Sequence, residues 1–184
     1  DNVRLFFEAH DTVICTCVTK LVRDTEGRDL YGVDMCVELC ARLRKRRSGV
    51  GLVVAMPEVV DTSLFEEIRN RIDGLGLAAH VCIVKEGSLF PAVLNRSDVF
   101  VRPTSTDGYG ISVAEALEQG VPAVASDVCD RAPGCLCFRS RDPEAFAGAV
   151  MEAVASREPR RADEQGAKDS AGKLVGLYLQ LIES

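Results

Sequence analysis

The residues best placed for binding chemistry lie in a glycine-rich stretch followed by a short helical pattern. Gly108 and Gly110 stand directly before a pattern that begins at Ile111 and continues through Ser112. The first amide groups of a helix have no internal acceptor, and the helix dipole adds partial positive charge at that end. Glycine carries no side chain, so an anion can approach the main chain closely. We therefore predict a phosphate-binding turn built from the backbone amides of Gly110, Ile111 and Ser112.

Acidic residues flank this turn at a spacing that suits a sugar. Glu115 lies three residues after Ser112, on the same face of the helix. A carboxylate repels a phosphate, but it can accept hydrogen bonds from the vicinal hydroxyls of a ribose joined to that phosphate. Asp107, on the loop, could face the hydroxyls of a sugar beyond a diphosphate. The spacing therefore fits a nucleotide, with Asp107 as a simple helix cap and Glu115 as a surface residue left open as alternatives.

Alternating strand-like and helix-like patterns position this loop. Continuous apolar runs, typical of buried strands, recur between segments with apolar residues at helical spacing. This alternation predicts an α/β fold: a single doubly wound, Rossmann-like domain with a mostly parallel sheet of about six strands and helices on both faces. Ligands of such domains bind beyond the carboxyl ends of the strands, where this loop falls. The predicted strands cover residues 12–18, 49–56, 80–84, 98–103, 121–126 and 134–138.

The chain of 184 residues is long enough for one domain with a hydrophobic core. We expect the core to span about residues 11–155, with residues 156–184 forming a polar link and an amphipathic C-terminal helix. No apolar run approaches the length of a membrane span, and the first residues lead into a short strand-like run, not the long apolar core of a signal peptide. Because the chain does not begin with methionine, we expect the natural polypeptide to be longer.

The net charge and the cysteine content limit which partners, disulfides and metal sites we expect. The formal net charge is -6, which argues against nucleic acid as the main partner. The basic run at 42–47 follows a helical pattern and fits a solvated helix end, with an anionic partner or an anionic membrane surface as the alternative. The eight cysteines include no Cys-x2-Cys pair. We expect structural thiols in a reducing cytosol, rather than disulfides or a metal site built from Cys129, Cys135 and Cys137.

The stretch "DGYGISVAEALEQGVPAVAS", residues 107–126, resembles the donor-binding half of GT-B glycosyltransferases, in particular the retaining enzymes of family 4, or group 1. That family carries a Glu-x7-Glu motif of the form "EGFGxxxxEAMAxGxPVVAS". The preceding "LFPAVLNRSDVFVRPTST" is similar to the family's helix, turn and strand, so the agreement is continuous over residues 89–126. Weaker agreement extends over about residues 11–155. The resemblance implies a retaining glycosyltransferase of the hexosyltransferase type and of the bacterial kind.

The resemblance also implies a role for each matching residue. Asp107 would face the donor sugar, and Glu115 would hold the ribose. Lys20 would contact the diphosphate as a cation, which suits a leaving group that gains negative charge as the glycosidic bond breaks. The residues near Val84 and Lys85 would border the nucleobase. The implied site comprises the catalytic residues Lys20 and Asp107 and the donor-binding residues Gly108, Gly110, Ile111, Ser112, Glu115, Val84, Lys85 and Arg28.

The sequence departs from the family's motifs at four positions. The first acid is Asp107, one methylene shorter than glutamate. The family's glycine and the arginine that follows it are Thr19 and Lys20. The family's second cation, a lysine, is replaced by Tyr31, and Arg23 or Arg28 could restore that charge. These departures leave a second hypothesis open, in which the domain is a degenerate, non-catalytic module for interaction or regulation. A third hypothesis is a different nucleotide-sugar enzyme of the same fold, such as an epimerase.

The same resemblance implies the partners. The substrate would be a nucleotide-diphosphate sugar, and the resemblance implies no cofactor and no metal. The chain also lacks the Asp-x-Asp run of many metal-dependent transferases. The N-terminal, acceptor-binding domain of a GT-B enzyme is absent from the chain, so we expect this fragment to be inactive alone. We expect a cytoplasmic protein, peripheral to the membrane if its acceptor is lipid-linked.

Overall fold

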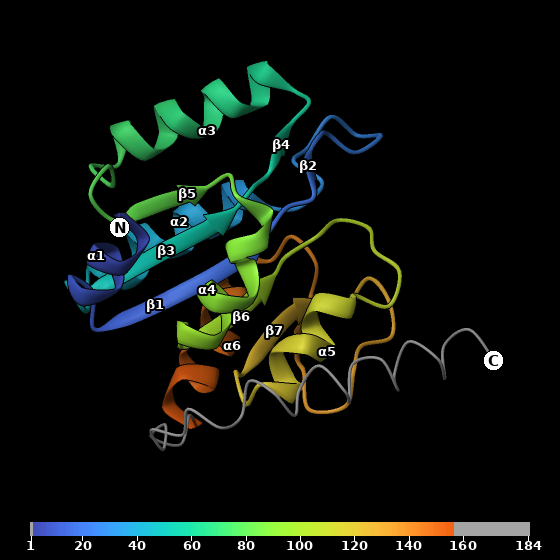
Figure 1. Cartoon of the computed structure of the whole chain (residues 1–184). Helices are drawn as coiled ribbons and strands as arrows, with labels where there is room; N and C mark the ends of the chain where they lie inside the picture. The colour runs from blue at the N-terminus through green and yellow to red at the C-terminus, as the bar shows by residue number, and fades with distance from the viewer. Residues whose placement is uncertain (1, 157–184) are drawn as a thin grey trace.

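The fold is built around one parallel sheet, and the computed structural model describes it over residues 2–156. The strands are β1 (Thr12–Cys17), β3 (Val50–Ala55), β5 (Val81–Val84), β6 (Val99–Arg102), β7 (Ala123–Ser126) and β8 (Leu136–Phe138). They hydrogen-bond in the order β5-β3-β1-β6-β7-β8, and every neighbouring pair is parallel. The chain fills one half of the sheet outwards from β1, then returns and fills the other half from β6 (Figure 1). This doubly wound α/β architecture confirms the predicted fold.

Burial on both faces explains why these strands read as continuous apolar runs. β3 and β7 are buried at every position, and β1 is buried at its four central residues. A strand in the middle of a parallel sheet is covered by helices on both sides, so it has no polar face. The alternating pattern in the sequence thus corresponds to three layers, with the sheet in the middle.

Helices cover both faces of the sheet and enclose two separate apolar cores (Figure 1). The larger core includes Ile14, Leu52 and Phe146, and the smaller core includes Phe100 and Val113. The predicted phosphate-binding turn leads into the layer over the smaller core. The helices over the larger core are α2 (Val33–Arg44), α3 (Thr62–Gly74) and α6 (Pro143–Ser156); those over the smaller core are α1 (Asn2–Glu8), α4 (Phe90–Arg96), preceded by the 3-10 turn η1 (Gly87–Leu89), and α5 (Ile111–Glu118).

The strand-like run predicted at the start of the chain is wrong. The helix α1 begins at the second residue and continues to Glu8. Val3, Phe6 and Phe7 recur at helical spacing and pack against the smaller core. The packing of these three side chains therefore decides the local conformation, and a short apolar run alone did not distinguish helix from strand.

A second, two-stranded sheet lies beyond the ends of β1 and β3 and was not predicted. It is formed by β2 (Lys20–Leu21) and β4 (Glu58–Val59), which pair in parallel. Two residues separate β1 from β2, and two separate β3 from β4, so the small sheet continues the direction of the main one. It places Lys20 just past the carboxyl edge of the main sheet.

Three other expectations concern membrane-spanning helices, the cysteines and the end of the chain. Within residues 2–156, no helix is long and apolar enough to cross a membrane. All eight cysteines are free thiols. The link and C-terminal helix predicted beyond residue 156 lie outside the described residues.

Candidate functional site

The predicted phosphate-binding loop lies at the carboxyl edge of the sheet. Residues 103–110 leave the end of β6 and lead into α5, beside the end of β1. The direction of winding reverses between these two strands, and α/β domains bind ligands in the crevice at such a switch point. The Ser126 hydroxyl donates to the Thr104 carbonyl (2.7 Å), and the Ser105 amide donates to the Leu30 carbonyl (2.9 Å). These hydrogen bonds hold the loop where a ligand would approach.

The start of α5 is open to an anion. Gly110 occupies the N-cap position in a left-handed conformation (φ 75°, ψ 64°) and has no side chain that could cap the helix. Three other helices differ, because a carboxylate accepts hydrogen bonds from their first amides: Asp29 at α2, Asp61 at α3 and Asp142 at α6. α5 therefore leaves its first amides and the positive end of its dipole for an anion from outside the chain.

The Asp107 carboxylate lies before α5 and is held by two guanidinium groups. Arg102 donates from Nε (2.5 Å) and Nη2 (3.1 Å), and Arg131 donates from Nη1 (2.7 Å). Burial acts to raise the pKa of Asp107, but the hydrogen bonds from the two arginines outweigh burial and lower the pKa to about 2. The other hydrogen bonds to Asp107 come from the Thr104 hydroxyl and the Gly108 amide and not from the first amides of α5, so the alternative of Asp107 as a simple helix cap does not hold.

Arg131 is enclosed by the loop and supports it. Its side chain is 1% exposed. Besides Asp107, the guanidinium binds the Ser126 carbonyl through Nε (3.0 Å), and its Nη2 lies 3.4 Å from the Thr104 hydroxyl. A Cβ on Gly110 would lie 2.5 Å from Arg131 Nη1, so glycine is needed here for space as well as for its backbone conformation. Arg131 therefore fixes the shape of the turn from the inside.

Arg102, the last residue of β6, points from the strand end toward the start of α5. Its Nη1 lies 3.3 Å from the Ser112 hydroxyl and 3.8 Å from the Cys17 thiol at the end of β1. Its guanidinium also lies over the Tyr31 ring, with Cζ 5.6 Å from the ring centroid. The side chain is 13% exposed. A partly accessible positive charge thus lies between β1, β6 and α5.

Glu115 lies half-buried on α5, one turn after the loop. Burial raises the pKa of its carboxyl, and the charge of Glu118 adds to this effect. The charges of Glu115 and Arg102 both act on the thiol of Cys17, whose own pKa is raised by burial. Glu115 is therefore close to the switch point, neither sealed in the core nor on the open surface.

The predicted cations Lys20 and Arg28 make ion pairs of their own. Lys20 is exposed on β2, and its Nζ lies 3.6 Å from Glu58 Oε2 on β4. Arg28 binds Asp24 through Nε (2.9 Å) and Glu26 through Nη1 (2.7 Å). The structure therefore places Lys20 beside the carboxyl edge and holds Arg28 within its own loop.

Val84 and Lys85 lie at the carboxyl end of β5, which is an outer strand of the main sheet. Val84 ends β5 and is buried, whereas Lys85 follows it and is exposed. β5 lies three strand positions from β6, which is about 14 Å at the usual spacing between strands. The predicted nucleobase region and the phosphate turn thus lie along one edge, at a separation that an extended nucleoside diphosphate can span.

Two residues of this site were not predicted from the sequence. A charged residue at the end of an otherwise apolar strand was the available signal for Arg102. Arg131 follows Asp107 by 24 positions, in a loop with no pattern that links the two. Within residues 2–156, no group of three or more His, Cys, Asp or Glu side chains is arranged to hold a metal ion. The site is therefore built from backbone amides, guanidinium groups and carboxylates.

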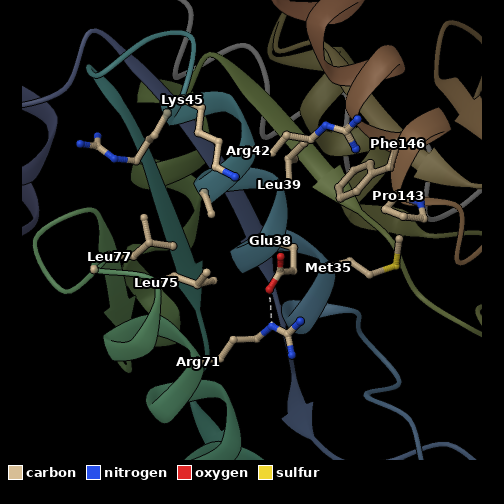
Figure 2. A pocket seen from close by; sticks show the side chains of 13 residues that line it. Met35, Glu38, Leu39, Arg42, Lys45, Arg71, Leu75, Leu77, Pro143 and Phe146 are labelled. Carbon is tan, nitrogen blue, oxygen red and sulfur yellow. Dashed lines mark hydrogen bonds and ion pairs between the residues drawn. The ribbon is translucent and has the colours of Figure 1, made fainter.

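A groove of about 790 Å³ lies on the other side of the sheet, over α2 (Figure 2). The side chains of Arg42, Lys45 and Arg71 and the apolar side chains of Leu39 and Leu77 line it. None of the predicted donor-binding residues belongs to its lining. The groove is therefore separate from the turn before α5.

Comparison with protein families gives the family of the chain. A family model described as "Glycosyl transferases group 1" matches residues 27–169. The chain belongs to this family. The matched span includes β6, the loop before α5, and α5 itself, so the turn, Arg102 and Arg131 lie inside the family domain, whereas Lys20 precedes the matched residues. No curated protein sequence matches this group 1 glycosyltransferase domain.

Solved structures share its fold at low sequence identity. The C-terminal domain of LpcC, a glycosyl transferase group 1 family protein from Francisella tularensis, has a TM-score of 0.66 at 12% identity and covers 85% of this chain and 84% of that chain. HepE from Anabaena, solved in complex with UDP and glucose, has a TM-score of 0.67 at 13% identity and covers 98% of this chain and 49% of that chain. A UDP-forming α,α-trehalose-phosphate synthase from Burkholderia vietnamiensis has a TM-score of 0.64 at 14% identity and covers 95% and 42%. The group 1 domain thus spans less than half the length of the two longer proteins.

Proposed function

We propose that this domain binds the nucleotide-diphosphate sugar of a retaining glycosyltransferase and positions it for transfer of a hexose. The observation that carries the proposal is the start of α5, which has no side-chain cap, lies at the switch point and is followed one turn later by Glu115. An uncapped helix start attracts a diphosphate, and a carboxylate at this distance can accept hydrogen bonds from a ribose. Family membership supports the same assignment.

In this proposal the ligand lies along the carboxyl edge of the sheet. The amides of Gly110, Ile111 and Ser112 hold the diphosphate, and Glu115 accepts hydrogen bonds from the ribose. The nucleobase lies at the end of β5, next to Val84 and Lys85. HepE, a structural neighbour, was solved with UDP, so UDP is the first nucleotide to test.

The chemistry assigned to the domain is stabilisation of the leaving group. When the bond between the sugar and the diphosphate breaks, negative charge develops on the diphosphate oxygen. The dipole of α5 and nearby cations lower the energy of that charge, with Lys20 as the cation implied by the family resemblance. No cofactor or metal is required by this scheme.

The remainder of the enzyme is proposed from the family. Because the domain covers 49% or less of the longer structural neighbours, we propose that an acceptor-binding domain completes the active site and that residues 1–184 alone do not transfer sugar. A cytoplasmic enzyme acting on a lipid-linked acceptor at the membrane fits this arrangement. Sugar transfer by the isolated chain would contradict it.

Calorimetric titration of the chain with UDP, GDP and ADP tests the proposal. Glu115→Gln removes a charged acceptor of ribose hydrogen bonds, so it should weaken the best nucleotide by about 10- to 100-fold. Glu152→Gln removes the same charge from an exposed position on α6 and serves as the control. If the folded wild-type chain binds none of the three nucleotides at millimolar concentration, the proposal is wrong.

A second function is favoured by one observation. Both oxygens of the Asp107 carboxylate accept hydrogen bonds from arginine side chains of the same chain, so this acid is not free to face a sugar. A non-catalytic module for interaction or regulation could carry such a site. It predicts that Glu115→Gln in the full-length protein leaves cellular activity unchanged, whereas the transferase predicts a loss.

A further inference from the structure

A diphosphate at α5 needs more positive charge than the helix supplies. The start of a helix acts as roughly half an elementary charge, whereas the diphosphate of a nucleotide sugar carries about two negative charges. Cations near the first turn of α5 therefore decide how tightly the diphosphate binds. The question is which side chain of this domain supplies them.

Most cationic side chains at the carboxyl edge form ion pairs with acids that do not belong to α5. Lys20 lies opposite Glu58 in the small sheet, and Arg141 pairs with Asp34 on α2. Arg23 binds Asp61 and Glu67 on α3, and Arg28 binds Asp24 and Glu26 within its loop. Neither Arg23 nor Arg28 is therefore directed at the turn before α5.

Arg102 differs because it contacts the first turn of α5 directly. Its Nη1 lies 3.3 Å from the hydroxyl of Ser112, one of the residues whose amides form the predicted turn. Asp107 takes the Nε hydrogen and one hydrogen of Nη2, and the guanidinium has five N–H donors. The other contacts of Nη1, to the Ser112 hydroxyl and to the Cys17 thiol at 3.8 Å, are long. The Nη1 side is therefore available for stronger acceptors, such as phosphate oxygens.

The pairing with Asp107 does not cancel this charge. Asp107 is shared with Arg131, so these three side chains, two guanidinium groups and one carboxylate, together carry one net positive charge. Arg131 is enclosed at 1% exposure, whereas Arg102 is 13% exposed. The accessible part of the net charge thus belongs to Arg102.

The Tyr31 ring holds the guanidinium from a second direction. Arg102 Cζ lies 5.6 Å from the ring centroid, within the range of a cation–π contact. Asp107 and Tyr31 together fix the plane of the guanidinium, so little conformational freedom remains to be lost when a ligand binds.

We propose that Arg102 binds the diphosphate of the donor, together with the first amides of α5, and serves as a cation that stabilises the leaving group. This inference rests on the proposed function, since it names a binding residue of the same site. Arg102 is the ligand-contacting residue, and Asp107, Arg131 and Tyr31 position it.

The test compares nucleoside diphosphates with monophosphates. The chain is titrated with UDP, GDP and ADP and with UMP, GMP and AMP, for the wild type, Arg102→Met and Arg102→Lys. Loss of a charge-assisted, forked contact should weaken the diphosphate by about 10- to 100-fold in Arg102→Met, and less in Arg102→Lys, which keeps a point charge. The ratio of diphosphate to monophosphate affinity should fall in the same order. Arg69→Met, an exposed position on α3, is the control.

The outcomes separate this inference from the proposed function. Diphosphate binding by the wild type that is unchanged in Arg102→Met overturns the role of Arg102 and leaves the proposed function intact. Equal weakening of diphosphate and monophosphate, together with a lower melting temperature, shows a structural role and also overturns the inference. A wild type that binds none of these nucleotides overturns both.

Discussion

Replacing Gly110 with alanine tests whether the start of α5 and the ion pairs behind it form one unit. Gly110 and Gly120 lie at the two ends of α5, and both have left-handed backbone conformations, with φ of 75° and 68°. A Cβ at Gly110 would lie 2.5 Å from Arg131 Nη1, whereas a Cβ at Gly120 would have no neighbour within 4 Å. Gly110→Ala and Gly120→Ala therefore share the conformational cost and differ in the contact.

The expected magnitudes follow from these surroundings. An alanine in the left-handed region costs about 1–2 kcal/mol, which is the whole effect expected of Gly120→Ala. Gly110→Ala also pushes Arg131 away from Asp107, and breaking a buried ion pair costs about 3–5 kcal/mol. Arg131 keeps its hydrogen bond to the Ser126 carbonyl, so only part of that cost applies. We expect Gly110→Ala to lower the free energy of unfolding by about 1–4 kcal/mol more than Gly120→Ala.

Urea unfolding of the chain, followed by circular dichroism, measures this difference. Nucleotide titrations of the same samples give a second readout, since displacement of Arg131 changes the shape of the turn that we propose to bind the diphosphate. Binding should weaken in Gly110→Ala and stay unchanged in Gly120→Ala. Free energies of unfolding that agree within about 0.5 kcal/mol for the two variants would refute the packing of Arg131 against Gly110.

Two further predictions concern pH. The pKa of Asp107 is lowered from 3.8 to about 2 in the folded chain. The Asp107 carboxylate therefore contributes fully to the free energy of unfolding above about pH 4, and this contribution is lost as the pH falls toward 2. Urea titrations should show this loss in the wild type and a flatter dependence of the free energy of unfolding on pH in Asp107→Asn. Burial lowers the pKa of His80 from 6.5, so the unfolded chain takes up the proton first and the free energy of unfolding should fall as the pH drops below about 6.5. His80→Asn should reduce that slope in titrations between about pH 5 and 8, and a slope of the opposite sign would contradict the burial of a neutral imidazole.

Local signals in the sequence were sufficient for the layers of the fold. Apolar runs gave the strands because burial on both faces leaves no polar positions in β3 or β7. Asp61 before α3 and the Asp142–Pro143 pair before α6 are typical residues of a helix start, and both carboxylates accept hydrogen bonds from first-turn amides in the structure. These features depend on neighbours within four residues, so a single sequence contains them.

Contacts between distant segments could not be read in the same way. The Asp107 carboxylate joins Arg102 from β6 and Arg131 from the loop after β7, and no spacing rule connects the three. Spacing could not show whether Arg23 or Arg28 restores the missing charge for the same reason, and in the structure nearby acids bind both side chains. The turn and the helix of the site were therefore predictable, whereas the arrangement of charges around them required the fold.

Two of the departures from the family motif belong to one connected group in the structure. These are the shorter acid Asp107 and the tyrosine at position 31, which suggested a degenerate domain when taken separately. Arg102 links them, because one side of its guanidinium binds Asp107 and its face lies over the Tyr31 ring. An aromatic ring in place of a second cation avoids repulsion with that arginine. If Arg102 binds the diphosphate as proposed, β6 supplies the positive charge that the family places at position 31, and the titrations of Arg102→Met distinguish this rearranged site from a degenerate one.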